Sequence, residues 1–227
     1  TTGDGFYIWN RDKGVQAELN TYLLAMLALA DNAIAKLGAR PDMVPELRTC
    51  YSVGPHYSYY QVEGLDPRGH DYIVGDVTIE LARMISQCLP GQILVGDFDR
   101  PVEDGLEPSR PLQFVVQADS ALARFGGLRL QDRLVSGIRC YLTGVENERG
   151  GYDIQRYLIR DKHGLQHQVF NQKFNIYLSR DAGSGNVDAL YLGKRQEDLG
   201  EFEAASAGTV PLDGAAGRAS RKTQQSR

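Results

Sequence analysis

Residues 15–38 carry apolar side chains at intervals of three and four positions. The members of this series are Leu19, Tyr22, Leu23, Met26, Leu27, Ala30, Ala33, Ile34 and Leu37. The spacing places them along one side of an α-helix, and Gly38 follows as a C-terminal cap. A helix with one apolar side buries that side against other elements, so the sequence predicts a layered fold built around this helix.

Segments rich in β-forming residues follow the helix. Residues 47–53 and 57–62 are expected to be two strands of one sheet. A polar loop is predicted over residues 64–75, then a second helix over 76–89 and a short buried strand over 92–95. This order predicts an α/β fold of the α+β sandwich type, with helices packed on a mixed, mostly antiparallel sheet.

The chain divides into four predicted parts. Residues 1–98 form the first unit, and residues 99–111, which contain three prolines, are expected to be a linker. Residues 112–202 form a C-terminal α/β extension of unassigned role, in which residues 152–178 are predicted to contain a β-hairpin. Residues 203–227 lose large apolar side chains, so we expect a disordered tail.

Composition excludes several classes of protein. The net charge of −4 over 227 residues argues against a nucleic-acid partner. Three cysteines (Cys50, Cys88 and Cys140) form neither a disulfide framework nor a C-x-x-C metal motif, which indicates a reducing, cytoplasmic location. The longest strongly apolar stretch, residues 22–29, is shorter than the roughly 20 residues of a membrane span. Residues 1–12 lack the apolar segment of a signal peptide.

The first five residues, TTGDG, have the composition of a tight β-hairpin turn and lack an initiator Met. Residues 6–9 then form a β-type run. Because a hairpin needs a strand on both sides of its turn, we expect the chain to be N-terminally incomplete, with at least one strand missing.

Four segments match a known pattern in their order and spacing. They are residues 2–9 (TGDGFYIW), 48–54 (RTCYSVG), 75–83 (GDVTIELAR) and 90–95 (PGQILV). Together they resemble the class III nucleotidyl cyclases, the adenylyl and guanylyl cyclase catalytic domains, over roughly residues 1–98. The third segment follows the family frame G-x-x-V-N-x-A-x-R and the fourth is close to P-G-Q-I-L-V. We expect the sheet to be ferredoxin-like.

The resemblance implies conversion of a nucleoside triphosphate to a 3′,5′-cyclic nucleotide and pyrophosphate. Two Mg²⁺ or Mn²⁺ ions would activate the ribose 3′-hydroxyl and neutralise the triphosphate. Asp4, in the turn between Gly3 and Gly5, would be a metal ligand, and Arg83 would stabilise charge on the α-phosphoryl group. Asp4 can also be read as an ordinary turn residue, and Arg83 as a surface ion-pair partner.

Several positions depart from the family pattern. Ile79 stands where the family has its catalytic Asn and has no hydrogen-bonding group to orient a ribose. Cys50 and Ser52 replace a Gly and a His of the second segment. The base-selecting position falls on Asp71 or on Tyr72, so the nucleotide base stays unassigned. The family's first metal-binding Asp and its base-contacting Lys belong to residues preceding the Gly-Asp-Gly turn.

Three hypotheses remain open at this stage. The first is an active cyclase-like signalling domain, which by family resemblance would be a homodimer with metals from one subunit and Arg83 from the other. The second is a cyclase-fold module that does not catalyse and instead serves regulation, dimerisation or nucleotide sensing, a reading that Ile79 favours. The third is a generic α/β domain with chance motif matches.

Overall fold

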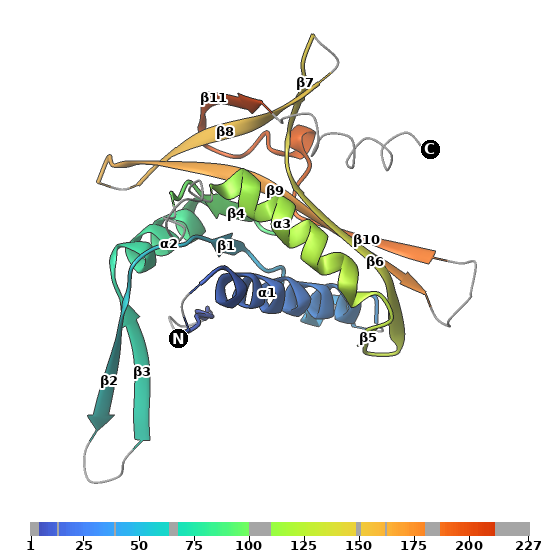
Figure 1. The fold of residues 1–227 in the computed structure, drawn as a ribbon, viewed down its shortest axis with the longest axis horizontal. Coiled ribbons are helices and arrows are strands. Elements are labelled where there is room, and N and C mark those ends of the chain that lie inside the picture. The colour runs from blue at the N-terminus through green and yellow to red at the C-terminus, as the bar shows by residue number, and fades with distance from the viewer. Residues whose placement is uncertain are drawn as a thin grey trace.

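The computed structural model describes residues 5–12, 14–38, 40–63, 68–99, 110–148, 151–161, 163–179 and 187–211 (Figure 1). The α-helices in this part of the chain are α1 (Val15–Lys36), α2 (Asp76–Gln87) and α3 (Pro111–Leu122). Short 3-10 helices are η1 (Pro41–Met43), η2 (Ala123–Phe125) and η3 (Gln196–Asp198). The two helices predicted over residues 15–38 and 76–89 are therefore confirmed. None of the helices in these ranges is long and apolar enough to cross a membrane.

The strands come from both halves of the chain. They are β1 (Thr49–Tyr51), β2 (Tyr57–Glu63), β3 (Arg68–Val74), β4 (Ile93–Gly96), β5 (Arg129–Leu130), β6 (Arg133–Leu142), β7 (Gly144–Glu146), β8 (Tyr152–Arg160), β9 (Gln166–Ser179), β10 (Val187–Leu192) and β11 (Ala205–Pro211). Nine of them form one sheet in which β1 and β4 are parallel and the other pairs are antiparallel. The predicted α+β class with a mixed, mostly antiparallel sheet is confirmed, and so is the hairpin formed by β8 and β9.

The long strand β9 organises the sheet. Along one of its edges it pairs first with β8 and then with β6, and along the other edge with β4 and then with β10. Its alternate side chains enter two separate cores. Phe174 and its neighbours on the same face pack under α1 and α3, whereas Val169 packs with Met84 and Cys88 from α2 and the strand–helix connection. Helix α2 therefore covers the face of the sheet opposite to α1.

An aromatic cluster joins the two units predicted from the sequence. Tyr51 of β1 stacks on Phe114 of α3 with ring centroids 5.1 Å apart, and Tyr22 of α1 meets Phe114 edge-on at 5.4 Å. Strand β4 also pairs directly with β9. The sheet and this core thus run across both sides of the predicted linker, of which residues 100–109 lie outside the described residues.

Strands β2 and β3 form a separate two-stranded sheet, which we call the β2–β3 arm. Figure 1 shows the arm projecting away from the helices and the large sheet. The prediction that residues 47–53 and 57–62 share one sheet is wrong, because β1 joins the large sheet while β2 pairs with β3. The loop predicted over residues 64–75 is also wrong for 68–74, where β-forming Tyr72, Ile73 and Val74 extend a strand.

Two other expectations differ from the structure at the ends of the chain. Residues 6–9, predicted as a β-type run, form no strand. The prediction of a disordered tail from residue 203 is wrong for residues 205–211, because Ala205–Pro211 forms β11 and pairs with β8. Residues 212–227 lie outside the described residues. Small and polar residues can take part in a sheet through their backbone hydrogen bonds alone, so their composition did not reveal this strand.

Candidate functional site

Arg83 lies at the centre of a polar cluster between α2 and the sheet. The cluster consists of Ser52, Glu80, Arg83, Asp161 and His167. Glu80 and Arg83 are three residues apart on α2, which places them on neighbouring positions of the same helix face. Ser52 follows β1, and Asp161 and His167 come from the β8–β9 hairpin. The fold therefore brings polar groups from both halves of the chain to one place.

The guanidinium of Arg83 is engaged by Asp161. Its Nε lies 2.8 Å from Oδ2 of Asp161, whose side chain is only 3% exposed, compared with 27% for Arg83. Nη1 of Arg83 lies 3.4 Å from Nε2 of His167. The same Nε2 lies 3.8 Å from Oδ2 of Asp161, so the histidine is placed beside both partners of the ion pair. Two side chains of the hairpin thus hold the arginine in one position.

The backbone of the hairpin turn orients the Asp161 carboxylate and stabilises its charge. Oδ1 of Asp161 accepts hydrogen bonds from the backbone N–H groups of His163 at 2.8 Å and Leu165 at 2.9 Å. Burial by itself raises the pKa of this carboxyl, but the backbone donors of Leu165 and His163 and the Arg83 guanidinium outweigh it and lower the pKa below its ordinary value. Asp161 therefore remains ionised and pairs with Arg83 as a carboxylate.

The pKa of Glu80 is shifted in the opposite direction to that of Asp161. Burial raises its pKa, and the negative charge of Asp97 raises it further, while the Ser52 hydroxyl and His167 lower it. Oγ of Ser52 donates a hydrogen bond of 3.1 Å to Oε2 of Glu80. A side chain at Gly96 would place a Cβ 2.7 Å from Oγ of Ser52 and 2.8 Å from Oε1 of Glu80, so glycine is required there for this pair to fit.

Asp97 and Arg156 lie beside the cluster. Nη1 of Arg156 is 4.0 Å from Oδ2 of Asp97 and donates a hydrogen bond of 3.0 Å to Oε1 of Gln168. Burial raises the pKa of Asp97, against the lowering effect of the Arg156 and Arg110 charges. The site thus contains two carboxylates with raised pKa values and one, Asp161, with a lowered pKa.

Of the site residues predicted from the sequence, the structure describes Gly5, Asp71, Tyr72 and Arg83, and they lie on separate elements or segments. Gly3 and Asp4 lie outside the described residues, and Gly5 begins an irregular segment before α1. Asp71 and Tyr72 lie on β3 of the arm, where their backbones pair with Tyr60 and Tyr59. Arg83 lies within α2, where its described partners come from the β8–β9 hairpin.

Asp161 and His167 could not be selected from sequence reasoning. The segment around Asp161 predicts a hairpin turn, and this context favours turn or surface roles for His163 and His167. His167 and Arg83 are 84 positions apart, so only the packing of the β8–β9 hairpin beside α2 brings them together. Glu80 carried one usable signal, its position three residues before Arg83 on a predicted helix.

The described residues contain no group of three or more His, Cys, Asp or Glu side chains that could hold a metal ion. Asp4, the metal ligand that the cyclase resemblance implies, lies outside the residues that the structure describes. Comparison of the chain with protein-family models, curated proteins and solved structures finds no match. The resemblance to cyclases rests on the four sequence segments themselves.

Proposed function

We propose that the protein is a nucleotidyl cyclase-like signalling module that forms a homodimer and acts by regulation or nucleotide sensing instead of cyclisation. The observation that carries this choice is the engagement of Arg83. An arginine that stabilises a transition state has to present its guanidinium to the substrate, whereas here the Asp161 carboxylate binds Nε at 2.8 Å. Releasing Arg83 would leave a buried carboxylate without its cation, which is energetically unfavourable.

Ile79 supports the same choice. It occupies the position of the catalytic Asn in the family frame, and its side chain is half exposed. An apolar side chain at this position can neither donate a hydrogen bond to a ribose nor accept one from it. Loss of the orienting group together with an engaged arginine is consistent with a cyclase-like fold that has kept association and lost catalysis.

The β2–β3 arm supports the homodimer. Tyr57 pairs with Val74 and Tyr59 with Tyr72, so these four residues share one face of the two-stranded sheet. Their side chains are between 43% and 77% exposed. A contiguous aromatic and apolar face on a projecting hairpin is typical of an interaction surface, and aromatic residues are enriched in such interfaces. We assign this face to contact with a second copy of the chain.

The finer parts of the proposal follow from the resemblance. A nucleoside triphosphate is the expected small-molecule partner, no nucleic acid is expected, and the expected location is the cytoplasm. In the enzymatic alternative the same chain converts the triphosphate to a cyclic nucleotide with Mg²⁺ or Mn²⁺ and with Asp4 as a metal ligand. Asp71 or Tyr72 would then contribute to base selection.

An assay of the full-length protein distinguishes the two alternatives. The protein is incubated with Mn²⁺ and each of the four ribonucleoside triphosphates, and cyclic nucleotide and pyrophosphate are measured. We expect no product above that of a heat-inactivated sample. Equilibrium binding of the same nucleotides is measured in parallel, because a sensing module binds a nucleotide without converting it.

The variants Asp4→Ala and Arg83→Ala serve as controls for the assay. Product formation that is lost in both variants, with circular dichroism spectra unchanged, would overturn the regulatory proposal and establish the enzymatic alternative. Product formation that neither variant affects would contradict the assignment of both residues.

A further inference from the structure

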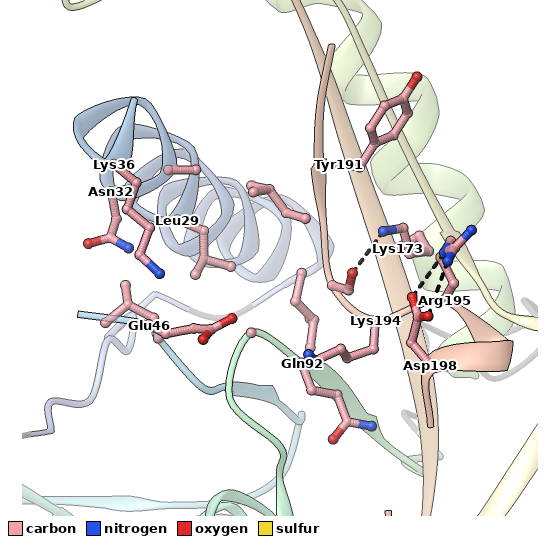
Figure 2. A pocket seen from close by; sticks show the side chains of 16 residues that line it. Leu29, Asn32, Lys36, Glu46, Gln92, Lys173, Tyr191, Lys194, Arg195 and Asp198 are labelled. Atoms are coloured by element: carbon pink, nitrogen blue, oxygen red, sulfur yellow. Dashed lines mark hydrogen bonds and ion pairs between the residues drawn. The ribbon is translucent and has the colours of Figure 1, made fainter. Parts of the chain in front are cut away.

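A cleft lies where two strands follow one another along the same edge of β9. Strand β4 pairs with β9 up to Gln172, and β10 pairs with it from Phe174 onward. The cleft at this junction has a volume of about 620 Å³ and is also lined by α1 (Figure 2). This volume is within the range of pockets that hold small organic molecules, about 300–1,000 Å³.

Lys173 lies at the junction itself, between the residues of β9 that pair with β4 and with β10. The residue is 5% exposed, and its Nζ donates a hydrogen bond of 2.7 Å to the backbone oxygen of Gly193. Burial lowers the pKa of this ammonium to about 8, and the charge of Arg195 lowers it further, while Asp198 and Glu197 act in the opposite direction. A buried cation of this kind is stabilised when an anion binds beside it.

Other cationic side chains line the same cleft. Figure 2 shows Lys36 on α1 at one side and Lys194 and Arg195 at the other. Arg195 is neutralised by ion pairs with Asp198 at 2.9 Å and Glu197 at 3.0 Å. Lys36 and Lys194 form no ion pair with any other residue that the structure describes. Four cationic side chains therefore face two anionic ones, Glu46 and Asp198, in a protein whose net charge is −4.

The remaining lining of the cleft is largely apolar. Its apolar members are Leu29, Ala33, Leu47, Ile93, Tyr191 and Leu192, and Asn32, Gln92, Gly91 and Gly193 complete it. A cavity whose lining combines apolar residues with several cations matches a ligand that has an apolar body and an anionic end. Neither water nor an inorganic anion has an apolar part that could pack against these apolar residues.

We propose that this cleft binds a small organic anion, with its oxyanion group at the lysines of the lining, Lys173 among them, and its apolar body against the apolar residues of the lining. The oxyanion group can be a phosphate or a carboxylate, and the structure defines the chemistry that both share. The proposal goes beyond the function proposed above, because neither the polar cluster around Arg83 nor the β2–β3 arm contributes to the cleft.

Isothermal titration of the full chain at pH 7 tests this assignment with three matched probes. They are 1-naphthyl phosphate, 1-naphthoate and neutral 1-naphthol. We expect at least one of the two anions to bind, with 1-naphthol at least tenfold weaker, and the stronger anion identifies the oxyanion class. The variant Lys173→Met, which keeps the buried stem without the charge, is expected to weaken binding at least tenfold.

Two further variants keep the test decisive if Lys173→Met does not fold. The double variant Lys36→Gln/Lys194→Gln changes only the rim and is expected to weaken binding of the anion about threefold or more. Arg129→Gln removes one exposed positive charge outside the cleft and is expected to leave the affinity unchanged. Absence of binding by both anions, equal binding of 1-naphthol, or equal affinity of the rim variant and the wild type would overturn the proposal.

Discussion

At the scale of single residues, Asp161 determines what Arg83 can do. The carboxylate accepts two backbone hydrogen bonds through Oδ1 and pairs with the guanidinium through Oδ2. The backbone hydrogen bonds of the turn already order the carboxylate, so formation of the ion pair costs little additional conformational entropy at Asp161. We therefore expect this ion pair to stabilise the packing of α2 on the hairpin more than an exposed ion pair with the same N–O distance would.

Replacing Asp161 by Asn is predicted to destabilise the protein in a pH-dependent way. The amide oxygen of Asn can still accept both backbone hydrogen bonds, so the substitution removes mainly the charge that pairs with Arg83. Since the pKa of Asp161 is lowered in the folded protein, its stabilisation is complete above the ordinary Asp pKa of about 3.9 and is lost as the pH falls through the lower folded pKa. Urea unfolding at pH 7 and below pH 3 measures the difference.

The control for this measurement is Asp188→Asn. Asp188 also pairs with an arginine, Arg133, at 2.6 Å, but its side chain is 62% exposed. We expect a small change in the free energy of unfolding, as for most exposed ion pairs. An Asp161→Asn variant as stable as wild type at pH 7 would contradict the role given to the ion pair.

Glu80 is predicted to behave in the opposite way. Burial, with the charge of Asp97, raises its pKa in the folded protein, so its effect on stability is most favourable at low pH and is lost as the pH rises through the folded pKa. The Glu80→Gln variant does not titrate at this position and is therefore expected to gain stability relative to wild type as the pH rises above the ordinary Glu pKa of about 4.3. Unfolding midpoints across a pH series test the sign, and a difference that stays constant with pH would refute it.

At the scale of secondary-structure elements, α3 connects the two units that the sequence separates. Phe114 is 1% exposed and contacts the rings of Tyr22, Tyr51 and Phe98. Phe114→Ala is predicted to reduce the free energy of unfolding by about 3–5 kcal/mol, the usual cost of removing a buried Phe side chain. Val116→Ala on the exposed side of the same helix is expected to change it by less than about 0.5 kcal/mol. Chemical denaturation measures both, and similar losses would contradict the packing.

The elements also show what the sequence could predict. Helix α1 was predictable because its core residues, among them Tyr22 and Met26, recur at helical spacing and are fully buried. Strand β4 was predictable as a short apolar run, and it is buried on both faces. Strands β3 and β11 were missed because Arg68-Gly69 suggested a turn and residues 205–211 lack large side chains. Their formation depends on pairing with β2 and β8.

At the scale of the whole molecule, the candidate site depends on long-range topology. Arg83 could be selected as a candidate residue from its motif, but its partners could not, since they lie on a hairpin about 80 residues further along the chain. The same holds for the cleft at Lys173, which exists only because β4 and β10 occupy successive parts of one edge of β9. A local pattern cannot specify such neighbours, because they are set by the order of strands in the sheet.

The arm is the other feature of the whole molecule that requires explanation. A two-stranded hairpin alone is at best marginally stable in water, and this one exposes an aromatic face. Association with a second arm would bury that face in both copies. The substitution Tyr57→Lys/Tyr59→Lys is predicted to prevent association without unfolding the protein, because both side chains are exposed within one chain. Val145→Lys on β7, also an exposed apolar position, is the matched control and should remain associated.

Sedimentation equilibrium of the wild type and these two variants tests the central claim, that this module is built for association. The predicted result is a mass of two chains for the wild type and for Val145→Lys at micromolar concentration, and a mass of one chain for Tyr57→Lys/Tyr59→Lys, with unchanged circular dichroism. A wild-type protein that has the mass of one chain up to about 100 µM, or a dimer that the arm substitutions leave intact, would contradict the account.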